Sequence, residues 1–517
     1  MSISYPSSVT VGIGALSIEE VVAVARYGAK VEISHDALDE IATTRSRVEE
    51  LAQDPTPVYG ISTGFGALAR RHIPEEMRAQ LQLSLVRSHA AGTGPEVETE
   101  VIRALMLLRL STLCTGRTGV RPVVAETYAA VLNANIHPVI REYGSLGCSG
   151  DLAPLAHAAL VLLGEGEVRV DGGDIIPAGE ALKAAGIEPL QLREKEGLAL
   201  INGTDGMLGQ LCLAITDLRE LAKTADIATA MTVEGLLGTL VVFADDLQQL
   251  RPHPGQADAA ANILAVAEGS AILEAALEEF KKNQVQDAYS VRCAPQVAGG
   301  FRDTVAHTAV VAERELAAAV DNPVVTKDGR VVSNGNFHGA PVAYALDFLA
   351  IVVADLASMS ERRTDRFLDT ARNRGLHAFL ADDPGVDSGH MIAQYAQAGI
   401  VSELKRLANP SSADSIPSSA MQEDHVSMGW SGARKLRKAV DGLQRVLAIE
   451  ILTAARAIDM REGEPAKGTG AVIAALRTTV QGPGTDRYLS PEIEETVRLV
   501  KEGALVDAVE EVVGTLR

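Results

Sequence analysis

The second half of the chain is dominated by apolar residues that recur at helical spacing. From Met207 to Ala454 one predicted helix follows another. Breaks fall at the turn Arg251-Pro-His-Pro-Gly255, at a hairpin around Asp328-Gly329 and in the loop Ala408 to Ser427. No fixed repeat period is present. The pattern predicts a mainly α protein built on a long-helix bundle, with a few short strands and hairpins.

The first 200 residues have a more mixed pattern. Short strands are predicted at Val9 to Ile13 and Val31 to Ser34, and Ser17-Ile-Glu-Glu20 is a capping box for the helix between them. Further helices are expected at 36–53, 97–113, 122–132 and 152–163, and a small hairpin with an Asp-Gly turn at 168–176. We therefore divide the chain into an N-terminal region (1–200), a central bundle (201–465) and C-terminal helices (466–517).

Composition narrows the class of protein. Of 517 residues, 47% are apolar, and the net charge of −21 with scattered Lys and Arg argues against a nucleic-acid partner. The four cysteines, Cys114, Cys148, Cys212 and Cys293, lie far apart and suggest neither a disulfide framework nor a zinc knuckle. The start of the chain does not resemble a signal peptide, and the best membrane candidate, 342–353, is short and contains Asp347. A cytoplasmic enzyme without membrane contact is expected.

A glycine-rich loop, Gly144-Ser-Leu-Gly-Cys-Ser-Gly150, leads into the apolar run 152–163. Such a loop can cradle a phosphate, but neither phosphate-binding fingerprint fits this spacing. A tightly bent X-Ser-Gly tripeptide offers a different chemistry, because the glycine nitrogen can attack the carbonyl of X. Loss of two waters then leaves a 4-methylideneimidazol-5-one ring, and glycine suits the attacking position because it has no Cβ.

The full run Gly144 to His157 resembles the self-made electrophile of the aromatic amino acid ammonia-lyases, and the resemblance extends over roughly residues 8 to 465. It implies a helical bundle of the ammonia-lyase and fumarase-like type. It also implies a ring formed from Cys148, Ser149 and Gly150, with no metal or nucleotide. Most members carry Ala at the position of Cys148, but the ring uses only the main chain of that residue.

The resemblance also assigns roles to polar residues between the helices. Tyr59, in a glycine loop where Ser62 replaces the usual Asn, would be the proton-abstracting base, and Ser88-His89 would select the substrate. Asp205 stands where glutamine is more common. The implied catalytic residues are Tyr59, Cys148, Ser149, Gly150, Asn202 and Tyr289, and the implied substrate-binding residues are His89, Asn202, Gln286, Arg292, Phe337 and Glu423.

Each of these positions also has a structural interpretation. Tyr59 could be a packed ring, His89 could cap a turn, and the segments 285–296, 333–339 and 414–428 could be capping loops. The neighbours Glu423, Asp424 and His425 do not have the spacing of a metal site. The joint match of all these segments in chain order favours the chemical interpretation.

The activity implied by the resemblance is non-oxidative deamination of L-histidine to trans-urocanate and ammonia, the first step of histidine degradation. A homotetramer with active sites shared between subunits is implied too. An ammonia-lyase or 2,3-aminomutase acting on tyrosine or phenylalanine is the nearest alternative. A ring-free lyase of the fumarase and argininosuccinate-lyase group would lack the Cys-Ser-Gly context, and an inactive scaffold would be expected to lose Tyr59, Ser149 or Arg292. The sequence leaves open whether the amine or the imidazole carbon attacks the ring.

Overall fold

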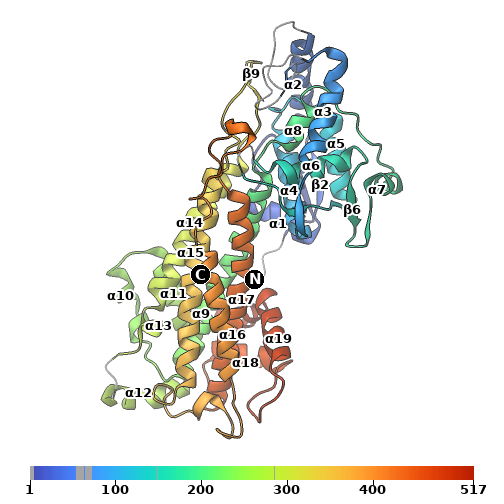
Figure 1. Cartoon of the computed structure of the whole chain (residues 1–517). Helices are drawn as coiled ribbons and strands as arrows, with labels where there is room; N and C mark the ends of the chain where they lie inside the picture. Colours follow the sequence, from blue (N-terminus) through green and yellow to red (C-terminus); the bar gives the residue numbers. More distant parts are fainter. Residues whose placement is uncertain (1–4, 54–62, 65–72, 148–149, 284–285) are drawn as a thin grey trace.

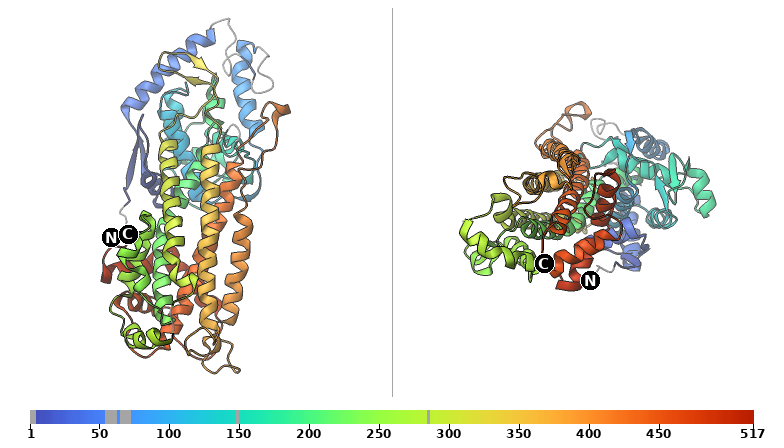
Figure 2. Two further views of the ribbon diagram at one scale, coloured as in Figure 1. Left: turned by 90° about the vertical axis from the view of Figure 1, so that its left-hand side faces the viewer. Right: turned by 90° about the horizontal axis from the view of Figure 1, so that it is seen from below.

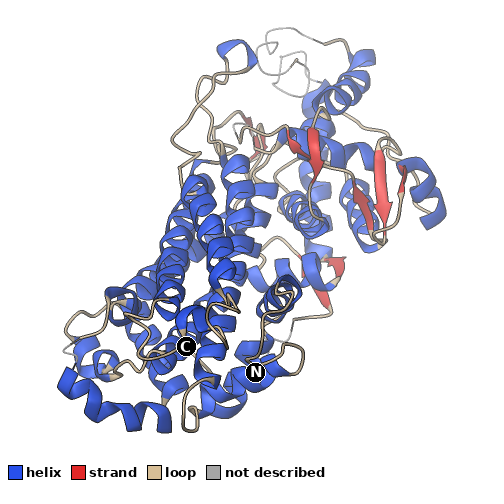
Figure 3. Cartoon of the chain, turned by 60° about the horizontal axis from the view of Figure 1, so that its bottom comes forward, coloured by secondary structure: helices blue, strands red, loops and turns tan. Residues whose placement is uncertain are grey.

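The fold is mainly helical, as predicted, with only a few short strands (Figure 3). A computed structural model of the chain describes residues 5–53, 63–64, 73–147, 150–283 and 286–517. In Figure 1 the first 200 residues form a mixed part at the upper right, and the long helices extend away from it.

The bundle consists of long helices that run side by side (Figure 2). They are α9 (Asp205–Gly235), α14 (Ala294–Leu316), α15 (Ala340–Leu368), α16 (Met391–Leu407) and α17 (Gly429–Asp459). The helices α9 and α17 have 31 residues each, which corresponds to roughly 47 Å of helix. The most extensive packing joins α17 to α15 and to α9, and their buried aliphatic side chains form one continuous core with the N-terminal part.

The N-terminal part wraps short helices around small sheets. Its helices are α1 (Ile18–Tyr27), α2 (His35–Gln53), α3 (Glu75–His89), α4 (Thr99–Cys114), α5 (Pro122–Asn133), α6 (Leu152–Leu162), α7 (Ala178–Ala185) and α8 (Glu196–Ile201). The predicted capping box of α1 is confirmed: the Glu20 amide donates to Ser17 Oγ at 3.1 Å, and the Ser17 amide donates to the Glu20 carboxylate at 2.8 Å.

The strands form four small sheets among the described residues. Strands β1 (Ser8–Val11) and β2 (Lys30–Ile33) pair in parallel, with Ser8 opposite Lys30. The other sheets are antiparallel: β3 (Thr93–Glu96) with β5 (Arg141–Tyr143), β4 (Ile136–Pro138) with β6 (Glu167–Val170) and β7 (Ile175–Pro177), and β8 (Val324–Val325) with β9 (Val331–Val332). The predicted hairpins at 168–176 and at Asp328-Gly329 are both confirmed.

Shorter helices surround the far end of the bundle and complete the chain. They are α10 (Asp245–Gln249), α11 (Pro254–Ala267), α12 (Ala271–Asn283), α13 (Tyr289–Arg292), α18 (Lys467–Arg477), α19 (Ser490–Lys501) and α20 (Ala504–Val513), with 3-10 turns at Val241–Phe243, Ala378–Leu380 and Ser419–Met421. The division at residues 200 and 465 stays a prediction.

Helix α15 is longer than the apolar stretch 342–353 considered from the sequence. By length and composition it is the one helix in the described part of the chain that could cross a membrane, but most of its apolar window is buried inside the protein. Asp347 within it is buried, and its carboxylate lies 2.9 Å from Lys435 Nζ on α17. These features are those of a core helix.

Candidate active site

Gly150 is pressed against the main chain of Gly203. Its φ is +78°, and the two glycines form an isolated parallel bridge. The Asp151 amide donates to the Gly203 carbonyl at 2.7 Å, and a Cβ on Gly150 would overlap that same carbonyl. Only glycine fits this position without displacing its neighbour. The preceding Cys148 and Ser149 lie outside the described residues, as does Tyr59.

Asp151 fixes the start of α6 to the start of α9. One carboxylate oxygen accepts the Met207 amide at 2.9 Å, and the other accepts the Ser145 hydroxyl at 2.9 Å. Burial raises the pKa of Asp151 to about 7. Helix α6 begins at Leu152, so its positive N-terminal end lies next to Gly150.

Asn202 lies between α8 and α9 and is only 3% exposed. Its Nδ2 donates to the Asn322 carbonyl at 2.9 Å, whereas its Oδ1 is buried without a partner among the described residues. The main-chain carbonyl of Asn202 accepts a hydrogen bond from Arg109 at 2.9 Å. An unpartnered buried oxygen is costly, so its orientation toward a ligand is the expected explanation.

Asp205, noted as a departure from the usual glutamine, is the partner of Arg109. Its carboxylate lies 3.2 Å from the guanidinium, and both side chains are almost completely buried. Burial raises the pKa of Asp205, opposed by the charge of Arg109. The departure therefore places a buried ion pair next to the Asn202 loop.

The loops that carry Phe337 and Glu423 both reach the segment before Gly150. The Gly339 amide donates to the Gly147 carbonyl at 3.2 Å, and the Ser427 hydroxyl donates to the same carbonyl at 2.8 Å. The side chains of Phe337 and Glu423 are both partly buried. The structure thus brings these two segments to the loop that precedes Gly150.

His89 is the last residue of α3, and the residues that follow it contact α6. Its Nδ1 is 2.8 Å from the Leu85 carbonyl, which can only accept, so the neutral ring carries its proton on Nδ1 and a lone pair on Nε2. Just beyond it, the Gly92 amide donates to Nε2 of His157 on α6 at 3.1 Å. The segment that follows His89 therefore packs on α6, the helix that follows Gly150.

The segment with Gln286, Tyr289 and Arg292, which we call the Arg292 island, lies away from Gly150. The Arg292 guanidinium stacks over the Tyr289 ring at 4.6 Å, and its Nε is buried without a hydrogen-bond partner among the described residues. The Ser290 carbonyl between them accepts from Arg363 at 3.2 Å.

That island lies at the opposite end of the bundle from Gly150. Arg363 pairs with Glu450 at 2.8 Å, and Glu450 also accepts the hydroxyl of Thr232, in the last turn of α9, at 2.7 Å. Since Gly150 lies beside the first turn of α9, the two groups are separated by roughly 40 Å of helix. Figure 1 agrees, with α13 far from α6 and α8. One chain therefore does not bring all the predicted site residues together.

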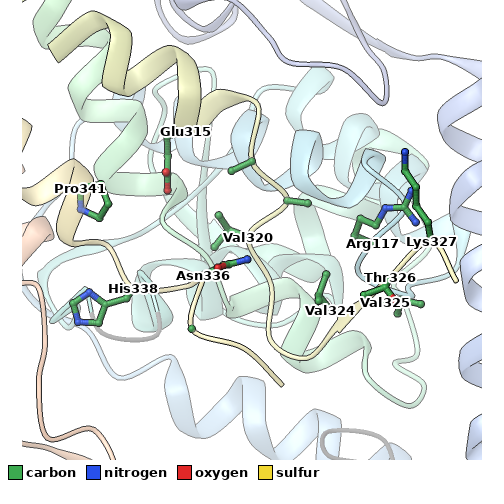
Figure 4. Close-up of a pocket in the computed structure, with 13 residues that line it drawn as sticks. Arg117, Glu315, Val320, Val324, Val325, Thr326, Lys327, Asn336, His338 and Pro341 are labelled. Carbon is green, nitrogen blue, oxygen red and sulfur yellow. The ribbon is translucent and has the colours of Figure 1, made fainter. Parts of the chain in front are cut away.

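A cavity of roughly 710 Å³ lies beside the Asn202 loop, but none of the predicted site residues that the structure describes lines it (Figure 4). Glu315, Asn336 and His338 face it, with Arg117 and Lys327 together at one side of the view. The cavity adjoins the predicted site, but it is not the candidate active site.

Sequence reasoning missed the buried charges that support Asn202: Arg109, Lys195 and Asp321. Their partners are remote in sequence, so spacing gave no indication of them. Only Arg109 left a signal, because it is an isolated cation within the apolar run 104–114.

Comparison with known proteins gives the family and the fold. The family described as "Aromatic amino acid lyase" matches residues 16–478. A histidine ammonia-lyase of Streptomyces coelicolor is 63% identical over 99% of this chain and 100% of its own length. Among solved structures, a tyrosine aminomutase from Streptomyces globisporus superposes with a TM-score of 0.93 at 37% identity, covering 99% of this chain and 100% of the other.

A histidine ammonia-lyase from Trypanosoma cruzi superposes with a TM-score of 0.89 at 38% identity, covering 97% of this chain and 95% of the other. The family match and the end-to-end relative confirm the family and fold expected from the sequence. The chain belongs to the aromatic amino acid lyase family.

Proposed function

We propose that this protein deaminates L-histidine to trans-urocanate and ammonia. The observation that carries the proposal is the 63% identity, along the whole chain, to a relative named histidine ammonia-lyase. The tyrosine aminomutase shares the fold at 37% identity, so the fold alone does not select between the two activities.

The electrophile we propose is a 4-methylideneimidazol-5-one formed from Cys148, Ser149 and Gly150. Two described features fit such a group: the required absence of a Cβ at Gly150, and the unpartnered buried Oδ1 of Asn202 nearby. When formed, the ring supplies an electron sink that turns the amino group into a leaving group. The proposal includes no metal and no nucleotide.

The protein's own residues would hold the substrate and move one proton. Tyr59 would accept the β-proton, which requires a phenol pKa below its ordinary value of about 10. Arg292 would bind the carboxylate with two parallel hydrogen bonds, supported by Gln286 and Tyr289. Stacking on the Tyr289 ring already holds the guanidinium in place.

Selection of histidine is assigned to His89 and Glu423, with Phe337 as an apolar wall. A neutral substrate imidazole has one N–H, which either the lone pair on Nε2 of His89 or the Glu423 carboxylate can accept, and the protonated ring can donate to both. A phenyl side chain has no N–H to donate to either acceptor, and each lost hydrogen bond of this kind costs about 1–3 kcal/mol. Discrimination of this kind reaches about 10⁴–10⁵-fold.

A homotetramer with shared sites is part of the proposal. The roughly 40 Å between Gly150 and the Arg292 island supports it, because another copy must supply one of the two groups. Helix α15 also exposes Tyr344, Phe348 and Ile351, each nearly half exposed, at helical spacing along one face. Such a stripe is typical of a subunit contact. A cytoplasmic location stays a prediction.

The test is a comparison of kcat/KM for L-histidine, L-tyrosine and L-phenylalanine, with products identified by mass. Histidine should be preferred and should yield urocanate, followed by its ultraviolet absorbance. Preference for a benzenoid substrate would contradict the assignment of His89, and a β-amino acid product would show an aminomutase instead.

A further inference from the structure

A buried ion pair lies behind the Asn202 loop, and neither of its members has been assigned to the chemistry. Lys195 precedes α8 and Asp321 follows α14, and both side chains are completely buried. The distance from Lys195 Nζ to Asp321 Oδ2 is 2.5 Å. Burial lowers the pKa of Lys195 and raises that of Asp321, and each charge opposes the shift of the other. Because such a pair contributes little net stability, its presence calls for another explanation.

The pair is connected to Asn202 through a single residue, Asn322. The second oxygen of Asp321, Oδ1, accepts the main-chain amide of Asn322 at 2.8 Å. The carbonyl of that same residue accepts Nδ2 of Asn202 at 2.9 Å. Asn334 supports the connection, since its side chain donates to the Asp321 carbonyl at 3.0 Å. Lys195 is therefore linked to Asn202 through Asp321 and Asn322.

The Asn322 carbonyl determines which way the Asn202 amide faces. A carbonyl can only accept, so the NH₂ group must face it and Oδ1 must point the opposite way. We propose that Lys195 and Asp321 are positioning residues, which fix the Asn322 carbonyl and thereby aim Oδ1 of Asn202 at the reacting groups. This inference rests on the role of Asn202 in the proposed function.

A second anchor separates this role from a general support of the loop. Arg109 donates to the main-chain carbonyls of Asn202 at 2.9 Å and of Ala199 at 3.1 Å. The main chain of the loop is therefore held independently of Lys195 and Asp321. Loss of the ion pair should release the side-chain amide of Asn202 and leave the loop in place.

The substitution Asp321→Asn isolates this effect, because the carboxylate serves two donors with two oxygens. An amide has only one oxygen, which the Lys195 ammonium would attract, so the NH₂ group would face the amide of Asn322. Donor would then meet donor, and the Asn322 peptide would lose its support. Removing the cation as well, with Lys195→Met, frees the amide oxygen to accept from Asn322 again.

The decisive experiment is a double-mutant cycle with Asn202→Ala. Misplacing a contacting group by about 1 Å can cost on the order of 10²-fold in rate, so Asp321→Asn should lower kcat by about 10- to 100-fold, with a much smaller change in KM. In the Asn202→Ala background the same substitution should lower kcat less than about twofold, because coupled residues are not additive. Lys195→Met with Asp321→Asn should recover most of the loss. Equal effects of Asp321→Asn with and without Asn202 would overturn the proposal.

A matched control and a second signal complete the design. Glu510→Gln removes the carboxylate that lies 2.7 Å from Lys223 on α9, remote from Asn202, and should leave kcat unchanged. Intact mass should show the loss of two waters in every variant, and the ultraviolet absorbance of the ring should shift equally in Asn202→Ala, Asp321→Asn and their combination. Additive absorbance shifts would count against the proposal. This signal does not depend on the substrate, so a failure to deaminate histidine would reject the proposed function alone. If Asp321→Asn does not fold, the same cycle is run with Lys195→Met.

Discussion

Two inactive variants of this protein should restore activity to each other when their subunits are mixed. One variant, Ser149→Ala, cannot form the ring, and the other, Arg292→Ala, cannot bind the substrate carboxylate. If each active site takes these two residues from different chains, a mixed oligomer contains some sites in which both are intact.

The expected recovery follows from the dimensions of the bundle. Gly150 lies beside the first turn of α9 and Ser290 is connected to its last turn, so roughly 40 Å separates the two groups within one chain. Random assembly of equal amounts gives each required residue a probability of one half. About a quarter of the sites should then be complete, so the mixture should regain about a quarter of wild-type kcat per site.

The assay is urocanate formation after denaturing the two variants together and reassembling them, with each variant reassembled alone as the control. KM for histidine should equal that of the wild type, because the complete sites are native. Oligomers that contain both variants, shown by mass, yet lack activity would refute the shared site. Recovery near wild-type level would equally contradict random pairing of two subunits at each site.

Three further substitutions test separate parts of the structure. A Cβ in Gly203→Ala would overlap the side chains of Asp205 and Arg109. This variant should unfold at a lower temperature in a thermal scan, and intact mass should show less ring formation. An unchanged Tm and an unchanged mass would refute the close packing. Burial lowers the pKa of His390 to about 3, so the unfolded chain takes up its proton first as pH falls below about 6.5. Stability should therefore fall by about 1.4 kcal/mol between pH 7.5 and 5.5, and denaturant unfolding of His390→Asn should lack this part of the loss. His89→Leu should lower kcat/KM for histidine and raise it for phenylalanine, and an unchanged ratio would remove His89 from substrate selection.

Much of the fold could be predicted because its signals are local. The capping box at Ser17 and Glu20, the Asp-Gly turns and the apolar run of α6 are each encoded within a few residues. Helix α15 was underestimated because Asp347 interrupts its apolar pattern. In the folded chain that carboxylate is paired with Lys435, which the local pattern could not show.

The site was predicted from motifs, and its supporting groups were not. Asn202 stood out because of the residues around it, whereas Lys195 and Asp321 meet across a separation of 126 residues. A single sequence carries no signal for a contact of that kind. Nor does it place Arg292 relative to Gly150, since their separation depends on the direction in which α9 runs.

The apolar length of α15 also has a consequence for how the protein is made. Its principal neighbour α17 ends at Asp459, so the ribosome must add roughly 90 residues after Leu368 before the two helices can pack along their full length. At about 5–20 residues per second, the nascent chain carries a helix with the hydropathy of a membrane span for roughly 5 to 20 s without that partner. Until α17 is made, only packing on the earlier helices α9 and α14, or binding to chaperones, can keep this segment from membranes and from other nascent chains.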